Sequence, residues 1–113
     1  MPVIDVTIIP DGLVPAGFTT TVTVGGVTTA NPTLRRNQDD IRWINNTGYK
    51  VVLFFPHDSV LGDDDAFHEI IHIGKKHRRV GPDLTVNPLI HYPYAIFVHG
   101  MFAHGSDLEV IVQ

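Results

Sequence analysis

Hydrophobic residues in this chain fall into short runs, and glycine, proline or a cluster of polar residues interrupts them every few positions. Several runs alternate apolar and polar residues and are rich in Val, Ile and Thr, which is typical of β-strands that bury one face. Residues 51–55 are all apolar, and we expect them to form a strand buried on both faces. Residues 67–73 fit either a strand or a short helix. The alternating pattern predicts further strands at residues 3–9, 19–24, 41–44, 77–80, 92–98 and 108–112.

The spacing of these segments predicts an all-β fold. Seven or eight short strands separated by turn residues, with no long helix, are typical of a two-sheet Greek-key sandwich or barrel. At most a short helix is expected near residues 60–70. No repeat, linker or change in composition divides the chain, so we expect residues 1–113 to form a single domain.

Length and charge narrow the classes of function. The 113 residues, 43% of them hydrophobic, suit one domain with one core. A net charge of −4 argues against nucleic-acid binding, and the basic cluster at residues 75–79 is interpreted as a solvated turn. No apolar run is long enough to span a bilayer. No signal peptide is recognisable, so we expect a cytoplasmic protein, or a periplasmic or secreted one whose leader was removed.

Two stretches of the chain resemble the cupredoxins, the plastocyanin-like blue-copper proteins. Residues 37–48 read Asn-Gln-Asp-Asp-Ile-Arg-Trp-Ile-Asn-Asn-Thr-Gly, similar to the turn, strand and Asn-Asn-x-Gly segment that leads to the first copper histidine in that family. Residues 92–104 read Tyr-x-Tyr-x-Ile-x-x-His-x-x-x-x-His, where plastocyanins have Tyr-x-Phe-x-Cys-x-x-His-x-x-x-x-Met before the last strand. Because the two stretches and the strand count cover most of the chain, the resemblance implies a cupredoxin-like sandwich.

The resemblance also implies that the blue-copper centre is lost. The position of the first copper histidine falls on Val51, and that of the cysteine falls on Ile96. His99 matches the second histidine, and His104 matches the axial methionine. The chain has no cysteine at all, and blue-copper character requires a thiolate ligand. We therefore expect a protein that is not an electron carrier and whose former copper position is filled by hydrophobic core.

The remaining histidines offer a metal-binding alternative. His99 and His104 would lie in the loop at the mouth of the former copper site, and His91 begins the strand that leads to it. Two or three imidazoles with water can hold Cu(II) or Zn(II). The same residues are also compatible with ordinary loop histidines, so no cofactor is required.

Residues 68–72 read His-Glu-Ile-Ile-His and match the H-E-x-x-H pattern of zinc hydrolases. On a helix, His68 and His72 would share a face, and Glu69 would act as the base on a zinc-bound water. A glycine follows soon after, so any helix here would be short. On a strand, the two histidines would share one face with Ile70, away from Glu69. A small zinc hydrolase is therefore the third hypothesis.

The hypothesis that best accounts for the apolar replacements is a binding or interaction module that lost its metal, without catalytic activity. Met101 and Phe102 lie in the loop between the two histidines, where an apolar pair is suited to contact a partner. The partner would be another protein or a second copy of the chain, because small sandwiches have strand edges that pair. Asn45-Asn46-Thr47 is also an N-glycosylation sequon, which matters only in a eukaryotic secretory pathway.

Overall fold

The computed structural model describes residues 3–11, 17–24, 27–29, 31–55, 68–82, 84–89, 91–98, 101–102 and 108–113. Every regular element within these ranges is a β-strand, which confirms the all-β expectation. Several short strands add to the seven or eight that the sequence predicts. In chain order, the strands are β1 (Val3–Asp11), β2 (Gly17–Val24), β3 (Val27–Thr29), β4 (Thr33–Leu34), β5 (Asp40–Asn45), β6 (Val51–Phe54), β7 (His68–Ile71), β8 (Lys76–Arg79), β9 (His91–Pro93), β10 (Ala95–Val98), β11 (Met101–Phe102) and β12 (Glu109–Val112).

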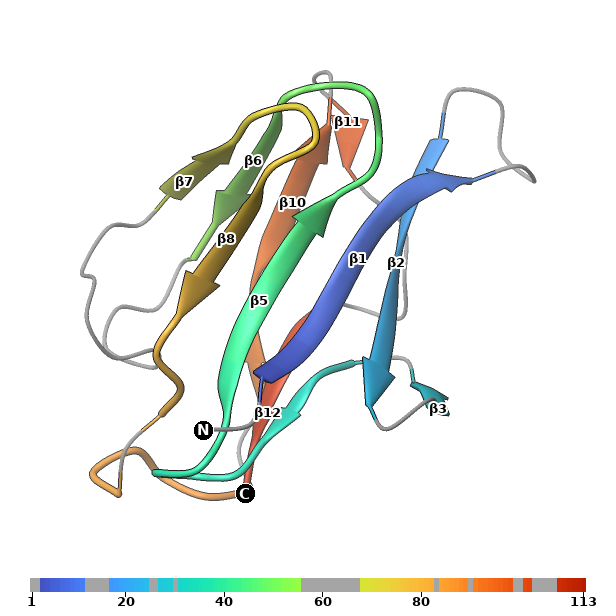
Figure 1. The fold of residues 1–113 in the computed structure, drawn as a ribbon. Helices are drawn as coiled ribbons and strands as arrows, with labels where there is room; N and C mark the ends of the chain where they lie inside the picture. The colour runs from blue at the N-terminus through green and yellow to red at the C-terminus, as the bar shows by residue number, and fades with distance from the viewer. Residues whose placement is uncertain are drawn as a thin grey trace.

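One layer of the fold is a five-stranded sheet with the order β3-β2-β1-β5-β8. Its central strand β1 pairs antiparallel with β2 and parallel with β5, so that Ile8 lies between Thr20 and Asn45. Residues of β1 alternate along the strand, and Ile4, Val6 and Ile8 are buried. The buried face of β1 therefore points toward the second layer, which Figure 1 shows behind β5 and β1.

The second layer consists of a four-stranded sheet and a three-stranded sheet. Their strand orders are β11-β10-β6-β7 and β4-β12-β9. In the four-stranded sheet, β6 pairs antiparallel with both β10 and β7, so that Val51 lies between Val98 and Ile71. Strands β7 and β8 follow one another in the chain but belong to different layers, and the turn between them closes one side of the sandwich (Figure 1).

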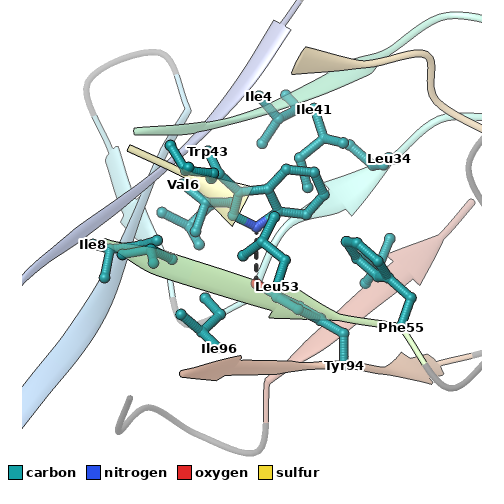
Figure 2. Close-up of a cluster of buried hydrophobic side chains, with 14 of the residues drawn as sticks. Ile4, Val6, Ile8, Leu34, Ile41, Trp43, Leu53, Phe55, Tyr94 and Ile96 are labelled. Atoms are coloured by element: carbon teal, nitrogen blue, oxygen red, sulfur yellow. Dashed lines mark hydrogen bonds between the residues drawn. The ribbon is translucent and has the colours of Figure 1, made fainter. Parts of the chain in front are cut away.

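Trp43 lies at the centre of the hydrophobic core between the layers (Figure 2). Its side chain is fully buried, and its ring centroid lies 5.5 Å from that of Phe55 and 5.9 Å from that of Tyr94. The indole Nε1 donates to the hydroxyl oxygen of Tyr94 at 3.5 Å. Leu34 and Val112 bring the three-stranded sheet into the same core. One continuous core thus joins all three sheets.

Strand β1 is longer than the sequence predicts, because it continues through Pro10 to Asp11. The pairing of β1 with β5 ends at Ile8, whereas the pairing with β2 goes on and sets Pro10 opposite Phe18. A proline lacks the N–H that a strand flanked on both sides would need. Here Pro10 has a neighbouring strand on one side within the described residues, so the strand tolerates it.

The prediction that residues 51–55 are buried on both faces is wrong. Val51, Leu53 and Phe55 are buried, whereas Phe54 is 42% exposed. A two-layer sandwich buries one face of each sheet, so alternate residues of β6 point away from the core. The continuous apolar run is therefore a strand with one face buried in the core, and its other, outer face is also apolar.

Most of the basic cluster at residues 75–79 lies in the strand that the sequence predicts at residues 77–80, and not in the solvated turn that was also suggested for it. Residues 76–79 form strand β8, which pairs antiparallel with β5. The last residue, Arg79, is only 4% exposed, and its guanidinium carbon lies 4.7 Å from the centroid of the Phe55 ring. A guanidinium over an aromatic face is a favourable cation–π contact. This arginine therefore belongs to the core and not to a basic surface patch.

The short helix expected near residues 60–70 falls mostly on residues 56–67, which lie outside the described residues. Residues 68–70 belong to strand β7. No helix among the described residues is long and apolar enough to cross a membrane.

Candidate functional site

The two positions that the sequence comparison matched to copper ligands carry buried hydrophobic side chains. Val51 on β6 and Ile96 on β10 are both fully buried, and they lie on neighbouring antiparallel strands where Ile96 faces Leu53 and Val51 faces Val98. Copper in such sites is held by imidazole nitrogen and thiolate sulfur, whereas these four side chains present only methyl and methylene groups. The residues present do not fit a blue-copper ion at this position.

His99 and His104, the first two candidates for a metal site, lie outside the described residues. His91 opens strand β9, and its Nδ1 lies 2.7 Å from Oε2 of Glu109 on the neighbouring strand β12. The His91 side chain is 55% exposed, so this pair lies at the surface. Within the described part of one chain, no three His, Asp or Glu side chains gather closely enough to hold a metal ion.

The H-E-x-x-H segment is a strand and a turn. His68, Glu69 and Ile70 lie on β7, and His72 begins the turn, where its carbonyl oxygen accepts from the Lys75 N–H at 3.0 Å. His68, Ile70 and His72 are exposed, while Glu69 is partly buried on the opposite face. The helical arrangement that sets a glutamate beside two zinc-bound histidines is therefore not formed over residues 68–71.

Glu69 instead faces the β8 side of the sandwich. Its Oε1 lies 3.9 Å from Nε2 of His77, whose side chain is 27% exposed while that of Glu69 is 21% exposed. His77 is the next histidine in the sequence after the H-E-x-x-H segment. The structure brings His77 close to the glutamate, on the face of β7 opposite to His68.

The outer surface of the four-stranded sheet is apolar, and sequence analysis missed it. Val52 on β6 lies between Ile70 on β7 and Phe97 on β10. Phe54 lies two residues further along β6, on the same face as Val52. Phe54 is 42% exposed, and Ile70 is 47% exposed. We call Val52, Phe54, Ile70 and Phe97 the apolar face. The signal was present in the unbroken apolar run of residues 51–55, which we interpreted as core on both sides.

The outer surface of the five-stranded sheet is more polar, although it also carries half-buried aliphatic residues such as Ile44. Thr7 on β1 lies opposite Thr21 on β2, and Asp5 lies opposite Arg42 on β5. Arg42 Nε donates to Asp5 Oδ1 at 2.8 Å, and Nη2 donates to Oδ2 at 3.0 Å. One outer surface of the sandwich thus has the composition expected of a solvated sheet, and the other does not.

Met101 and Phe102, the predicted partner contacts, form strand β11. This strand pairs with β10, so that Phe102 lies opposite Phe97 and Met101 lies opposite Val98. β11 is an outer strand of the sheet that carries the apolar face. Their role as partner contacts stays a prediction, and their place in the fold is next to the surface that the structure identifies.

The Asn45 side chain ties two connections together and is fully buried. Its Nδ2 donates to the carbonyl oxygen of Tyr49 at 2.7 Å, of Ile71 at 3.0 Å and of His72 at 3.3 Å. Its Oδ1 accepts from the backbone N–H and the hydroxyl of Thr47, at 3.0 Å and 2.7 Å. One amide thereby joins the turn after β5 to the turn between β7 and β8.

Two carboxyl groups in this protein have lowered pKa values, because each forms an ion pair with an arginine near the start of β5. Hydrogen bonds from the Arg35 guanidinium, at 2.9 Å, lower the pKa of Asp39. The Arg78 guanidinium, at 2.6 Å, likewise lowers the pKa of Asp40, which also accepts from the Gly81 N–H. Because each of these carboxylates is held by a structural arginine, neither is a candidate catalytic group.

Comparison with known proteins gives information about the fold alone. No protein-family model matches the sequence, and a search of curated proteins finds no match. Among solved structures, the chain is similar to the McoA multicopper oxidase from the hyperthermophile Aquifex aeolicus, with a TM-score of 0.56 and 12% sequence identity. The match covers 97% of this chain and 26% of the oxidase, so the chain spans about a quarter of that protein. This likeness and the two-layer arrangement of strands show that the chain has a cupredoxin-like β-sandwich fold.

Proposed function

We propose that this chain is a cupredoxin-like binding module that contacts a protein partner through its apolar face, and that it is not an electron carrier. The observation that carries the proposal is the exposure of Phe54 and Ile70, at 42% and 47%, next to Val52. The more polar outer surface of the five-stranded sheet provides the internal comparison. Folding does not require apolar residues on an outer surface, and exposed apolar patches commonly mark surfaces that bind a partner.

The energy available at this surface supports binding. Full burial of a Phe or Ile side chain contributes about 1.5–3 kcal/mol. Roughly half of each side chain is already buried, so covering Phe54 and Ile70 would contribute about 1 kcal/mol each. Val52 and Phe97 add smaller amounts, because they are half-buried in the isolated chain. A charge introduced into the middle of this surface would oppose such binding strongly, since burying an unpaired charge is costly.

The test compares one charged substitution on each outer surface. Phe54→Glu alters the apolar face, and Thr21→Glu is the matched control on the polar face. Each purified protein carries a photo-crosslinker and is presented to an extract of the source organism, and crosslinked proteins are identified by mass spectrometry. We expect a protein that crosslinks to wild type and to Thr21→Glu but not to Phe54→Glu. Identical crosslinking by all three proteins, with circular dichroism confirming that each is folded, would contradict the proposal.

A specific observation also supports Cu(II) or Zn(II) binding as a second candidate function. Metal-bound histidines commonly contact a carboxylate through the ring nitrogen that does not bind the metal. His91 has this arrangement, since its Nδ1 lies 2.7 Å from Glu109 while more than half of its side chain is exposed. Because β9 and β10 separate His91 from His99 along the chain, one open site completed by water would form at His91 and another at His99 and His104.

Calorimetric titration of untagged protein with Cu(II) and Zn(II) tests this second candidate. We expect binding that weakens in a His99→Ala/His104→Ala variant and in Glu109→Gln, which keeps the size of the side chain but removes its charge. Binding no tighter than about micromolar in wild type would eliminate the candidate.

A further inference from the structure

The segment His68–His72 has the same residue type at equal distances on either side of Ile70. We propose that β7 pairs antiparallel with β7 of a second copy, with Ile70 opposite Ile70, and that His68 of each copy and His72 of the other bind a Zn(II) ion between them. The inference rests on the proposed function, because it names a second copy of the chain as the partner of the sheet that carries the apolar face.

Strand β7 has an edge that a second copy can use. In the four-stranded sheet, β7 is the outermost strand, and β6 is its one neighbour among the described strands. The opposite edge of such a strand presents backbone N–H and C=O groups that can pair with another strand. The carbonyls of Ile71 and His72 already accept from the Asn45 amide, but a carbonyl oxygen has two lone pairs and can accept a second hydrogen bond. β7 contains neither proline nor lysine, the residues that commonly block such pairing.

The alternation of side chains selects one register. In a two-fold antiparallel pair, residues opposite one another lie on the same face of the sheet, so the axis must pass through a residue and not between two. An axis at Glu69 would set two carboxylates against each other, which is unfavourable. An axis at Ile71 would pair Ile70 with His72 and leave His68 opposite the turn. An axis at Ile70 uses the whole strand and sets apolar side chains opposite each other at its centre.

That register brings histidines of the two copies together. With Ile70 opposite Ile70, His68 of one chain faces His72 of the other, and this occurs twice in the dimer. Directly opposite residues have Cβ atoms about 4.5–5.5 Å apart, which allows two imidazoles to reach one metal ion. Both histidines are exposed on the outer face. Two imidazole nitrogens and two waters complete the four-coordinate shell that Zn(II) prefers.

A single copy does not provide this site. His68 lies on β7 and His72 directly follows that strand; both are exposed but Ile70 separates them, and the described part of one chain contains no cluster of three or more candidate ligands. The second copy supplies the missing imidazole at each position. On a helix, the H-E-x-x-H spacing sets both histidines beside one zinc ion. On an edge strand that pairs with its two-fold copy, the same spacing sets each histidine opposite the other histidine of the second chain.

The dimer would also extend the apolar face. Ile70 of each copy would cover the other, and Val52 and Phe54 of both copies would lie on one continuous outer surface of a sheet of doubled width. Ile70 is 47% exposed in the single chain, so this contact removes apolar surface from water. Zinc would then strengthen an association that backbone pairing and Ile70 already favour.

Sedimentation velocity of untagged protein at about 100 μM tests the proposal, with EDTA in one sample and a small excess of Zn(II) in the other. Wild type is expected to dimerise more tightly with Zn(II), by about tenfold or more. His68→Ala and His72→Ala should each abolish this zinc effect, whereas Gln38→Ala, which alters an exposed side chain in the turn before β5, should leave it intact. All substituted side chains are exposed, and circular dichroism checks that each variant is folded.

Two outcomes would overturn the inference, and both are distinguishable from failure of the proposed function. One is a wild-type protein that stays monomeric with Zn(II). The other is a zinc-dependent dimer that survives His68→Ala and His72→Ala but is lost in His99→Ala/His104→Ala. If crosslinking to another protein is nevertheless lost in Phe54→Glu and kept in Thr21→Glu, the binding function stands and only its assignment to a second copy fails.

Discussion

At the scale of single residues, the fold depends on a few buried polar groups that satisfy several partners at once. Asn45 is the main example, since its amide makes hydrogen bonds to both the turn after β5 and the turn between β7 and β8. An unsatisfied buried carbonyl costs more than a typical hydrogen bond contributes. The position therefore admits very few other side chains, because a replacement must donate to carbonyls on one side and accept from Thr47 on the other.

We expect Asn45→Ala to lower the free energy of unfolding by about 3 kcal/mol, because it removes the buried side-chain donor of the Ile71 carbonyl and the buried acceptor of the Thr47 N–H. Asn46→Ala is the matched control at the neighbouring exposed position and should change stability by less than about 0.5 kcal/mol. Urea unfolding followed by circular dichroism measures both. Equal effects of the two substitutions would show that the Asn45 hydrogen bonds do not stabilise the fold.

Tyr94 predicts how stability changes at alkaline pH. Burial of the phenol raises the pKa of Tyr94 from 10.0 to about 12, and the hydrogen bond from Trp43 opposes part of this rise. A raised pKa means that the contribution to stability is complete below pH 10 and is lost as pH increases toward 12. The free energy of unfolding should therefore fall over this range in wild type, and fall less in Tyr94→Phe. Urea unfolding at several pH values checks this, and parallel pH profiles for the two proteins would contradict it.

At the scale of elements, the strands were largely predictable and their partners were not. Alternation located the strands around Val6, Trp43 and Val110, because one-sided burial produces a period of two. It did not locate the ends, since Pro10 reads as a terminator when only its own neighbourhood is considered. It also missed the exposed side of β6, where Phe54 is as apolar as its buried neighbours. The parallel pairing of β1 with β5 joins residues far apart in the chain, and no local pattern encodes that choice.

The candidate site residues also divide into those that the local sequence could predict and those that it could not. Val51 and Ile96 are buried in the core, as the sequence predicted, and their match to the copper-ligand positions of the cupredoxins stays a prediction. The H-E-x-x-H segment was ambiguous, because a five-residue pattern is compatible with both a helix and a strand. Its conformation depends on pairing with β6, which is a tertiary contact.

Gly81 marks a place where two elements approach too closely for any side chain. A Cβ atom at this position would collide with the carbonyl oxygen of Asp39, just before β5. We expect Gly81→Ala to destabilise the protein by about 3 kcal/mol, because the backbone must shift. Gly74→Ala is the control: Gly74 has a positive φ of 71° but open space around it. Its conformational strain should cost about 1 kcal/mol. Thermal unfolding ranks the two variants, and a larger loss for Gly74→Ala would contradict the prediction.

At the scale of the whole molecule, one core joins three sheets, and the two outer surfaces differ in chemistry. Trp43 contacts residues on both layers, so its environment reports on the integrity of the entire sandwich. The outer surface of the four-stranded sheet is more apolar than that of the five-stranded sheet, so the two sides of the molecule differ. A partner can recognise one side while the other faces water.

Because Trp43 is the single tryptophan and is fully buried, its fluorescence is a probe of global unfolding. We expect the emission of the native protein to lie at short wavelength and to shift to the value of solvated tryptophan in a single transition. That transition should coincide with the one seen by far-ultraviolet circular dichroism, as two-state unfolding of a small domain requires. Separate midpoints for the two signals would show that part of the sandwich unfolds independently of the core.

The burial of Asn45 also has a consequence for how the protein can be produced. The nitrogen that would carry the sugar in the Asn45-Asn46-Thr47 sequon is the one that donates to three carbonyl oxygens in the folded chain. Oligosaccharide attachment and the native state are therefore mutually exclusive at this position. In a eukaryotic secretory host, any chain glycosylated before it folds would be retained as a misfolded product, whereas a bacterial host avoids this competition. The sequon thus acts as a biosynthetic constraint on where this sequence can be expressed, and not as a site of modification.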